Sequence, residues 1–218
     1  MARKRRRPIP DIASWAPNQE KFARFEALVL VTQRVNFIKT VMGLAEPEET
    51  VRRHMKLVCE RHGLKLQPAR GPGYDGRHLR HVNIPQRYHC SLLLGWLLQN
   101  SDGGICNDAQ AVDTGRLLDR MLYCYRRYLD LPVSSAQRCE VSFIMFYTLY
   151  RANAMGDVEL RVCDNCAGQF MLLRTAHTAS CPICAMQRHA RFAAHRQRLL
   201  QEQPESKPES PPPGQPTV

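Results

Sequence analysis

The sequence predicts a mainly α-helical protein, with a helical body followed by a small four-cysteine ribbon and a basic C-terminal segment. Apolar side chains recur at three- and four-residue steps through the body, which is the spacing of one helix face. Two C-x-x-C pairs come next, and an arginine-rich stretch follows the second pair. The expected divisions are a flexible basic arm at 1–17, the helical body at 18–156, the ribbon with its basic helix at 157–200 and a disordered Pro-rich tail at 201–218.

Three helices are expected in the first part of the body. The first begins near Asn18, and the second is short and ends at Gly43. The third starts near Pro47, where Glu48 and Glu49 would stabilise its positive N-terminal end. The positions expected to face the core are Phe22, Phe25, Leu28, Val29, Thr32, Val35, Ile38, Val41, Val51, Met55 and Val58.

A helix, a glycine turn and a second helix form the outline of a helix-turn-helix, whose second helix can enter the major groove of DNA. Arg52, Arg53 and Lys56 fall on the outer face of that second helix and are candidate DNA contacts. Many αα-hairpins share the outline, and a basic exposed helix face is often only solvated. Both interpretations stay open from these residues alone.

The next segment, residues 63–85, is rich in glycine and proline and predicts an exposed loop. It contains no phosphate-binding or dinucleotide-binding glycine motif. Its histidines, His78 and His81, and the nearby His89 have no carboxylate or cysteine at ligand spacing. We therefore expect these histidines at the surface and not at a metal.

Three longer helices should complete the core. In the last of them Ser134 and Gln137 form a capping-box pattern, and Gly156 ends the helix. The expected helices cover residues 86–99, 112–129 and 134–154. The middle one carries three tyrosines for which we favour burial over a partner surface, namely Tyr123, Tyr125 and Tyr128.

The charge of the chain indicates a polyanionic partner. There are 31 Lys and Arg residues against 20 Asp and Glu residues, which gives a formal net charge of +11 and a pI near 9.5. Nucleic acid is the first candidate and an anionic membrane surface the second. No apolar segment follows the basic N-terminus, and the longest apolar run, residues 92–98, is too short to span a bilayer. We therefore expect neither a secretory signal nor a membrane anchor.

Five of the nine cysteines stand singly in apolar or helical sequence. This distribution is typical of reduced thiols in a core and not of a disulfide framework. It predicts a reducing, cytoplasmic environment. The five are Cys59, Cys90, Cys106, Cys124 and Cys139.

The four paired cysteines, Cys163, Cys166, Cys181 and Cys184, predict one tetrahedral metal site, with one structural zinc ion as the expected occupant. Gly168 is expected to allow the backbone to reverse after the first pair. Four sulfur ligands leave no position for water or substrate, so the site should build structure and perform no chemistry. Two short strands, at residues 158–162 and 169–174, would flank the first pair as a zinc-ribbon-like module.

The basic segment after the ribbon is expected to be helical and fixed to the metal module. Anchored charges lose less chain entropy on binding than charges on a free tail, which favours phosphate contact. A merely solvated helix face is the other interpretation. The candidate DNA contacts are Arg188, Arg191, Arg196 and Arg198.

The helical body, the helix through Tyr128 and Leu129, the long helix ending near Gly156 and the C-x-x-C-x-G-x-F stretch at 163–170 together resemble FlhC, a family of flagellar master transcriptional activator subunits of bacteria. The resemblance covers about residues 20–200. It implies a zinc-containing, DNA-binding subunit that works with FlhD, four FlhD chains with two FlhC chains, and recruits RNA polymerase to flagellar operons. The basic arm and the Pro-rich tail depart from the family pattern.

Three functions are weighed from the sequence. The first is a DNA-binding transcription activator subunit, in which arginine and lysine contact phosphates and a few side chains reach base edges. The second is an interaction scaffold whose partner reads the DNA. The third is a thiol oxidoreductase that uses Cys163 and Cys166, which requires one dithiol to be free of metal. We expect no enzyme.

Overall fold

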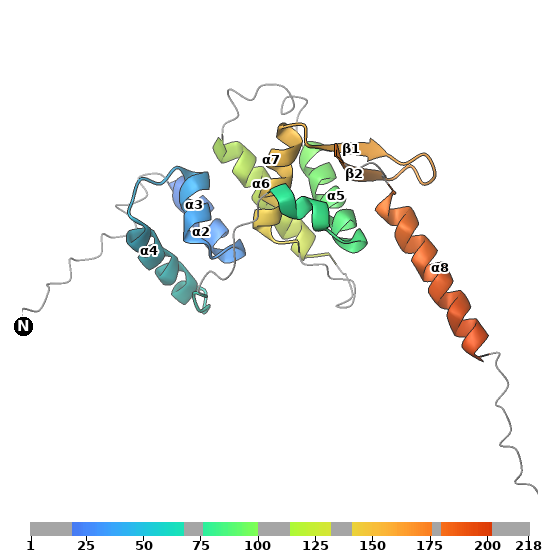
Figure 1. Cartoon of the computed structure of the whole chain (residues 1–218). Helices are drawn as coiled ribbons and strands as arrows, with labels where there is room; N and C mark the ends of the chain where they lie inside the picture. The colour runs from blue at the N-terminus through green and yellow to red at the C-terminus, as the bar shows by residue number, and fades with distance from the viewer. Residues whose placement is uncertain (1–18, 68–75, 100–113, 132–140, 176–179, 202–218) are drawn as a thin grey trace, which may run out of the picture.

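The computed structural model describes residues 19–67, 76–99, 114–131, 141–175 and 180–201. These residues form a mainly helical protein with one two-stranded sheet, as the sequence predicts. Helices α2 to α4 lie at one end, α5 to α7 in the middle, and the sheet with α8 at the other end (Figure 1). None of the described helices is both long and apolar enough to cross a bilayer.

The N-terminal group consists of α2 (Gln19–Val31), α3 (Val35–Met42) and α4 (Glu48–Arg61). Gly43 ends α3 in the left-handed conformation, with φ 59°, which confirms the predicted glycine turn. All the predicted core-facing positions of these helices are buried except Phe22, which is half-buried. The guanidinium of Arg61 covers the Phe22 ring at 5.7 Å from its centroid.

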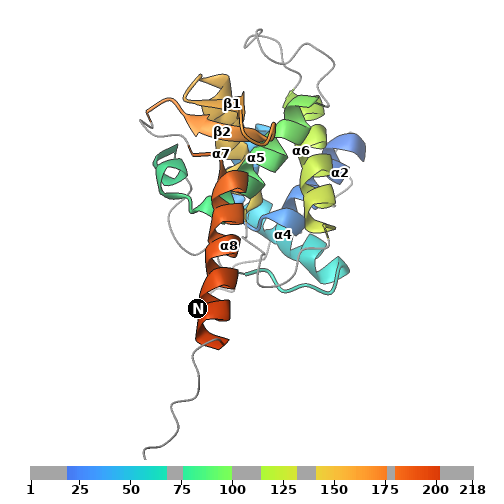
Figure 2. The same cartoon turned by 90° about the vertical axis from the view of Figure 1, so that its right-hand side faces the viewer.

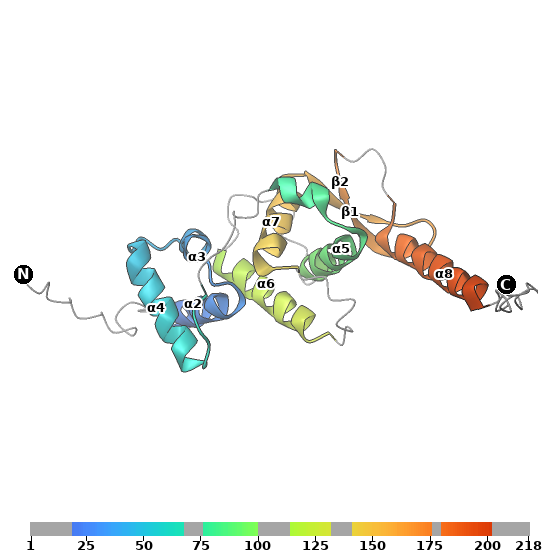
Figure 3. The same cartoon turned by 60° about the horizontal axis from the view of Figure 1, so that its bottom comes forward.

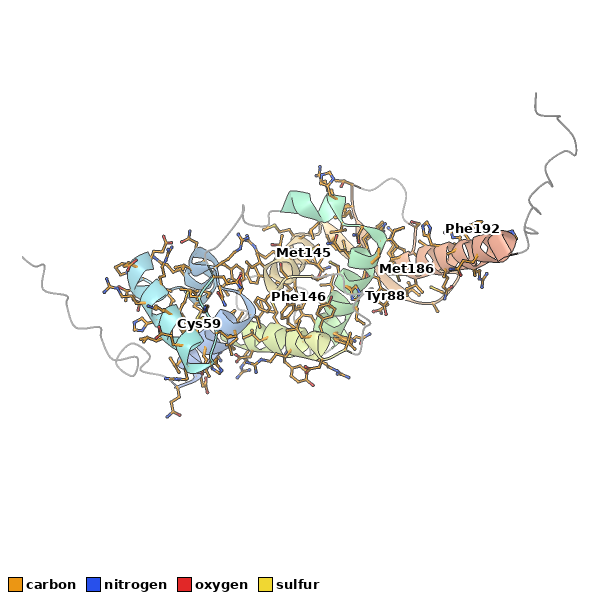
Figure 4. The ribbon with its side chains drawn as sticks, turned by 90° about the horizontal axis from the view of Figure 1, so that it is seen from below. Cys59, Tyr88, Met145, Phe146, Met186 and Phe192 are labelled. Atoms are coloured by element: carbon orange, nitrogen blue, oxygen red, sulfur yellow. The ribbon has the colours of Figure 1, made fainter. Side chains whose placement is uncertain are left out.

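The central group consists of α5 (Ile84–Gln99), α6 (Thr114–Leu129) and α7 (Phe143–Ala154). Its interior is aromatic: the rings of Tyr125 and Phe143 meet edge to face at 5.3 Å, and the Tyr125 hydroxyl donates to the carbonyl of Val141 at 3.0 Å. Phe37 of α3 meets the ring of Tyr147 at 5.2 Å, so the N-terminal and central groups share one core. Met145 and Phe146 lie inside it in Figure 4.

The predicted start of the last core helix is wrong. Ser142 is extended, with ψ 156°, and caps α7 by accepting a hydrogen bond from the backbone N–H of Met145 at 3.2 Å. A serine hydroxyl that satisfies this otherwise unpaired N–H fixes the start of the helix. Ser134 and Gln137, on which the earlier start was predicted, lie outside the described residues.

Two predictions of exposure also fail. A 3₁₀-helix, η1 (Gly76–His81), forms within the predicted loop and places Leu79 in the core. His89 is only 5% exposed, because it lies on the core side of α5 between the rings of Tyr88 and Tyr128. His81 is exposed as predicted, and the side chain of His78 is outside the described part of the chain.

Of the three tyrosines on α6, Tyr125 and Tyr128 are buried as predicted, but Tyr123 is 59% exposed. The single cysteines behave as predicted where they are described. Cys59, Cys90 and Cys124 are buried free thiols. Cys106 and Cys139 lie outside the described residues.

A buried histidine makes the stability of the N-terminal group depend on pH. His54 of α4 is fully buried, and burial lowers its pKa below the ordinary value of 6.5, although Glu46 acts in the opposite direction. Because the unfolded chain then binds the proton more readily, the contribution of His54 to stability is complete above pH 6.5 and is lost as the pH falls below it.

We expect the free energy of unfolding to fall by up to about 1.4 kcal/mol per pH unit below this point on account of His54. Urea unfolding of the wild type and of His54→Leu, followed from about pH 8 to pH 5, measures the effect. The difference between the two profiles isolates His54 from other titrating groups. A difference that does not change with pH would contradict the prediction.

Candidate metal centre

The first cysteine pair lies in the turn of a β-hairpin. Strand β1 (Val158–Val162) pairs antiparallel with β2 (Gln169–Leu173), with Val162 opposite Gln169. The first strand is confirmed as predicted, and the second ends one residue earlier. Within the turn the Cys163 N–H donates to the Gly168 carbonyl at 3.0 Å, and the Ala167 N–H donates to the Cys163 carbonyl at 2.8 Å. These bonds curl the backbone around the sulfurs.

The predicted role of Gly168 is wrong. The residue that reverses the chain is Ala167, which has φ 54°, whereas Gly168 does not have a positive φ. Gly168 instead leaves room for the second pair: a Cβ there would lie 2.6 Å from Cδ1 of Ile183 and 3.4 Å from Sγ of Cys166, so the end of the Ile183 side chain would have to shift. Since Ile183 stands between the two cysteines of the second pair, this glycine lets the second pair close over the first.

The second pair is built into the start of α8 (Pro182–Gln201). Cys181 precedes the helix and accepts a hydrogen bond at its carbonyl from the Ala185 N–H at 3.0 Å. Cys184 lies in the first helical turn, so one of the four sulfurs belongs to α8 itself. In Figure 2 the two strands lie directly above this first turn.

The four sulfurs converge. Sγ of Cys163 is 3.8 Å from Sγ of Cys184, Sγ of Cys166 is 3.7 Å from Sγ of Cys181, and all four atoms lie within 4.8 Å of one another. A tetrahedral zinc with bonds of about 2.3 Å would hold its sulfurs about 3.8 Å apart. The bond of a disulfide is far shorter, at about 2.05 Å, and all four thiols are free. The donor set and spacing therefore fit a four-coordinate metal ion, as predicted.

A metal ion that binds the cluster must displace protons from its thiols. The backbone N–H groups of Asn165 and Cys166 lower the pKa of Cys163 to about 7. The neighbouring Cys166 sulfur, together with burial, raises the pKa of Cys184 to about 12, and burial raises that of Cys181. Without metal the site thus holds shared protons, which a divalent cation must displace, so metal affinity falls as the pH falls.

The ribbon is fixed to α5 by contacts that the sequence did not reveal. The Met171 N–H donates to the hydroxyl of Ser91 at 2.9 Å in a buried bond, and that hydroxyl donates to the Arg87 carbonyl at 2.6 Å. The Arg87 guanidinium also donates to the carbonyl of Ser180, just before the second cysteine pair, at 3.3 Å. At Gly95 of α5 a Cβ would make only an ordinary van der Waals contact, 3.5 Å from Oε1 of Gln169. The sequence signal for this docking is Ser91, a polar residue that precedes the apolar run of α5.

Beyond its first turns α8 leaves the body of the protein. Every residue from Gln187 to His195 is exposed, and the helix extends away from the ribbon (Figures 1 and 3). It contains no Asp or Glu. Arg188 and Arg191 are exposed as expected of candidate DNA contacts. Arg196 and Arg198 belong to the same helix, but their side chains are not among those described.

The candidate DNA contacts on α4 have a different setting. Arg52, Arg53 and Lys56 are exposed, but each lies beside a carboxylate four residues away in the same helix. The nitrogen-to-oxygen distances are 3.0 Å for Arg52–Glu48, 3.3 Å for Arg53–Glu49 and 3.6 Å for Lys56–Glu60. Figure 3 shows α4 and α8 at opposite ends of the molecule. The structure therefore does not bring the two groups of candidate contacts together.

Comparison with known proteins gives no match, so a role is argued from the geometry of the structure. No family model matches the sequence, and no curated protein matches it either. The structure contains a four-cysteine cluster suited to a metal ion and an exposed basic helix, α8, that begins at this cluster.

Proposed function

We propose that this protein is a DNA-binding subunit of a transcription activator and that α8 is the helix that meets the duplex. One observation carries the proposal. The exposed part of α8 bears arginines and no carboxylate, while its first turn contains Cys184 of the metal cluster. A metal ion at the four sulfurs would fix the direction of the helix before any DNA is bound. Less conformational freedom is then lost on binding.

The charge of α8 is suited to phosphate. Each arginine that neutralises a phosphate releases condensed counterions, which provides affinity independent of sequence. On α4, by contrast, intrahelical carboxylates already neighbour the basic groups and would compete with phosphate for them. We therefore assign the principal phosphate contacts to Arg188, Arg191, Arg196 and Arg198, and we rank Arg52, Arg53 and Lys56 below them.

The rest of the proposal is supported by the resemblance to FlhC. On that basis the metal is zinc, the protein is cytoplasmic and not an enzyme, and it acts on flagellar genes. Its partners are double-stranded DNA, an FlhD-type subunit, in a complex of four FlhD with two FlhC, and RNA polymerase. A four-sulfur site is chemically suited to zinc and also to iron, so metal analysis of the purified protein decides the identity of the ion.

A salt titration of DNA binding tests the proposed function. We expect the logarithm of the association constant to fall linearly with the logarithm of the salt concentration, with a slope of about −3 to −4 if four arginines each neutralise one phosphate. Fluorescence anisotropy with a promoter duplex and a random duplex, in the presence of the co-purified partner, measures both slopes. Binding that ignores salt would refute the proposal, as would equal affinity for the two duplexes.

An interaction scaffold is the second candidate, and one observation favours it. Tyr123 is exposed beside a groove between α2 and α6, which is also lined by Leu30 of α2 and Arg126 of α6. Exposed tyrosine next to arginine is typical of protein interfaces. In this version the groove binds the partner and the partner reads the DNA. Both candidates share the partner and differ only in which subunit touches the duplex.

A further inference from the structure

We propose that Phe192 of α8 reads sequence by an apolar contact with the C5-methyl group of thymine in the major groove. This inference rests on the proposed function and deepens it, because it assigns a base contact to the helix that contacts phosphate. Phe192 is 71% exposed, the largest exposed fraction among the large apolar side chains of the described residues.

Phe192 lies among the basic residues of α8. At 3.6 residues per turn, positions 188, 195 and 196 fall within about 60° of position 192 around α8, and position 191 lies about 100° away. The side opposite position 192 carries small or neutral residues, Ala190, Ala194 and Gln197. Phe192 thus lies within the basic side and not on a side of its own. A helix that meets phosphates with this side presents the ring to whatever lies between them.

Phe192 does not belong to the core. Met186 is half-buried near the junction with the body, on the side of Tyr88 of α5, while Phe192 lies further along the helix (Figure 4). The described residues around it, from Gln187 to His195, are all exposed. Packing within the described part of the chain therefore does not account for an apolar ring at this position.

The combination of arginines and an apolar ring on this side of α8 indicates which partner binds there. A protein groove that covered this side would have to supply acidic groups for the arginines as well as an apolar pocket for the ring. The major groove of DNA supplies both: it is about 12 Å wide, which admits a helix, its edges are lines of phosphates, and its floor carries the methyl group of each thymine. Contact between phenylalanine and this methyl group is an established way of recognising thymine.

The test uses the full-length, metal-loaded chain with any subunit that co-purifies. A random-sequence duplex library is first enriched with the wild-type protein. The enriched duplex is then synthesised with each thymine replaced in turn by deoxyuridine, which lacks only the methyl group. Binding of these duplexes is compared for the wild type, Phe192→Ala, Phe192→Leu and Gln197→Ala. The last variant changes an exposed residue on the neutral side of the same helix and serves as the matched control.

We expect Phe192→Ala to bind the enriched duplex about 5- to 30-fold more weakly, with random-duplex affinity and salt slope unchanged. Phe192→Leu should retain part of the preference, and Gln197→Ala all of it. One deoxyuridine substitution should weaken binding by the wild type and have no further effect on Phe192→Ala, because the two changes remove the same contact.

Three results would overturn the inference while leaving the proposed function intact. The preference could survive in Phe192→Ala, the losses from deoxyuridine and from Phe192→Ala could add, or the variant could lose a co-purifying subunit instead of DNA. The last result would assign Phe192 to a protein interface. Failure of the proposed function is a separate outcome, in which the wild type itself shows no salt-dependent binding to any duplex.

Discussion

Replacement of Cys184 by serine is expected to abolish metal binding and to unfold the ribbon. Four-sulfur zinc sites contribute an apparent binding free energy of about 10–16 kcal/mol, and folding of such small modules depends on it. Val158 and Met171 of the strands pack in the main core, but Cys163, Phe170 and Cys181 form a separate apolar cluster, which is too small to hold the turn end of the hairpin and the start of α8 together without the ion. The metal content of the purified protein should fall from one ion per chain to a small fraction of that, and the amides of the cysteine turn between β1 and β2 should exchange rapidly.

The helical body should survive this substitution, because its core extends through α2 to α7. Far-UV circular dichroism should show most of the helix retained. Cys90→Ala is the matched control: Cys90 is a buried free thiol on α5 and is not one of the four clustered sulfurs, so its loss should leave the metal content unchanged. Full metal content and an unchanged melting profile in Cys184→Ser would rule out this account of the site.

Neutralisation of two arginines on α8 is expected to weaken DNA binding by about 30- to 100-fold near 0.1 M salt and to reduce the salt slope by about 2. The variant is Arg188→Gln with Arg191→Gln, both exposed on a helix without carboxylates. The loss should apply to promoter and random duplexes alike, since phosphate contacts carry no sequence information.

The matched control removes the same charge from the other end of the molecule. Arg52→Gln with Arg53→Gln breaks two ion pairs within α4, with an expected cost of less than about 1 kcal/mol in stability and less than about 3-fold in DNA affinity. If the α4 variant loses DNA binding and the α8 variant does not, the predicted helix-turn-helix is the reading element. If neither variant changes promoter affinity in the assembled complex, the scaffold interpretation is correct.

Patterns that repeat along the chain predicted the fold well. The three- and four-residue apolar spacing placed almost every core residue of α2, α3 and α4, because burial of one face is what stabilises such helices. The cysteine spacing predicted the four-cysteine cluster, since two C-x-x-C pairs can close on one ion regardless of the rest of the fold.

Features that depend on contacts between distant segments were not predictable. The Ile183 side chain lies against Gly168, and no local sequence pattern places these two residues next to each other. Burial of His89 depends on Tyr128 from another helix, and the docking of the ribbon depends on Ser91. The start of α7 was missed for another reason: its cap is Ser142, which is followed three residues later by Met145 instead of the Glu or Gln of a capping box.

The freestanding length of α8 has a thermodynamic consequence. The stretch from Gln187 to His195 is exposed throughout, and a helix of this length without tertiary support is only marginally stable in water, while like charges along one side repel each other. A polyanion laid against that side removes the repulsion and extends the ordered stretch outward from the cysteine anchor. Under the proposed function, the anchored start of α8 is ordered before binding, and part of the energy of association would be used to stabilise the helix beyond that start.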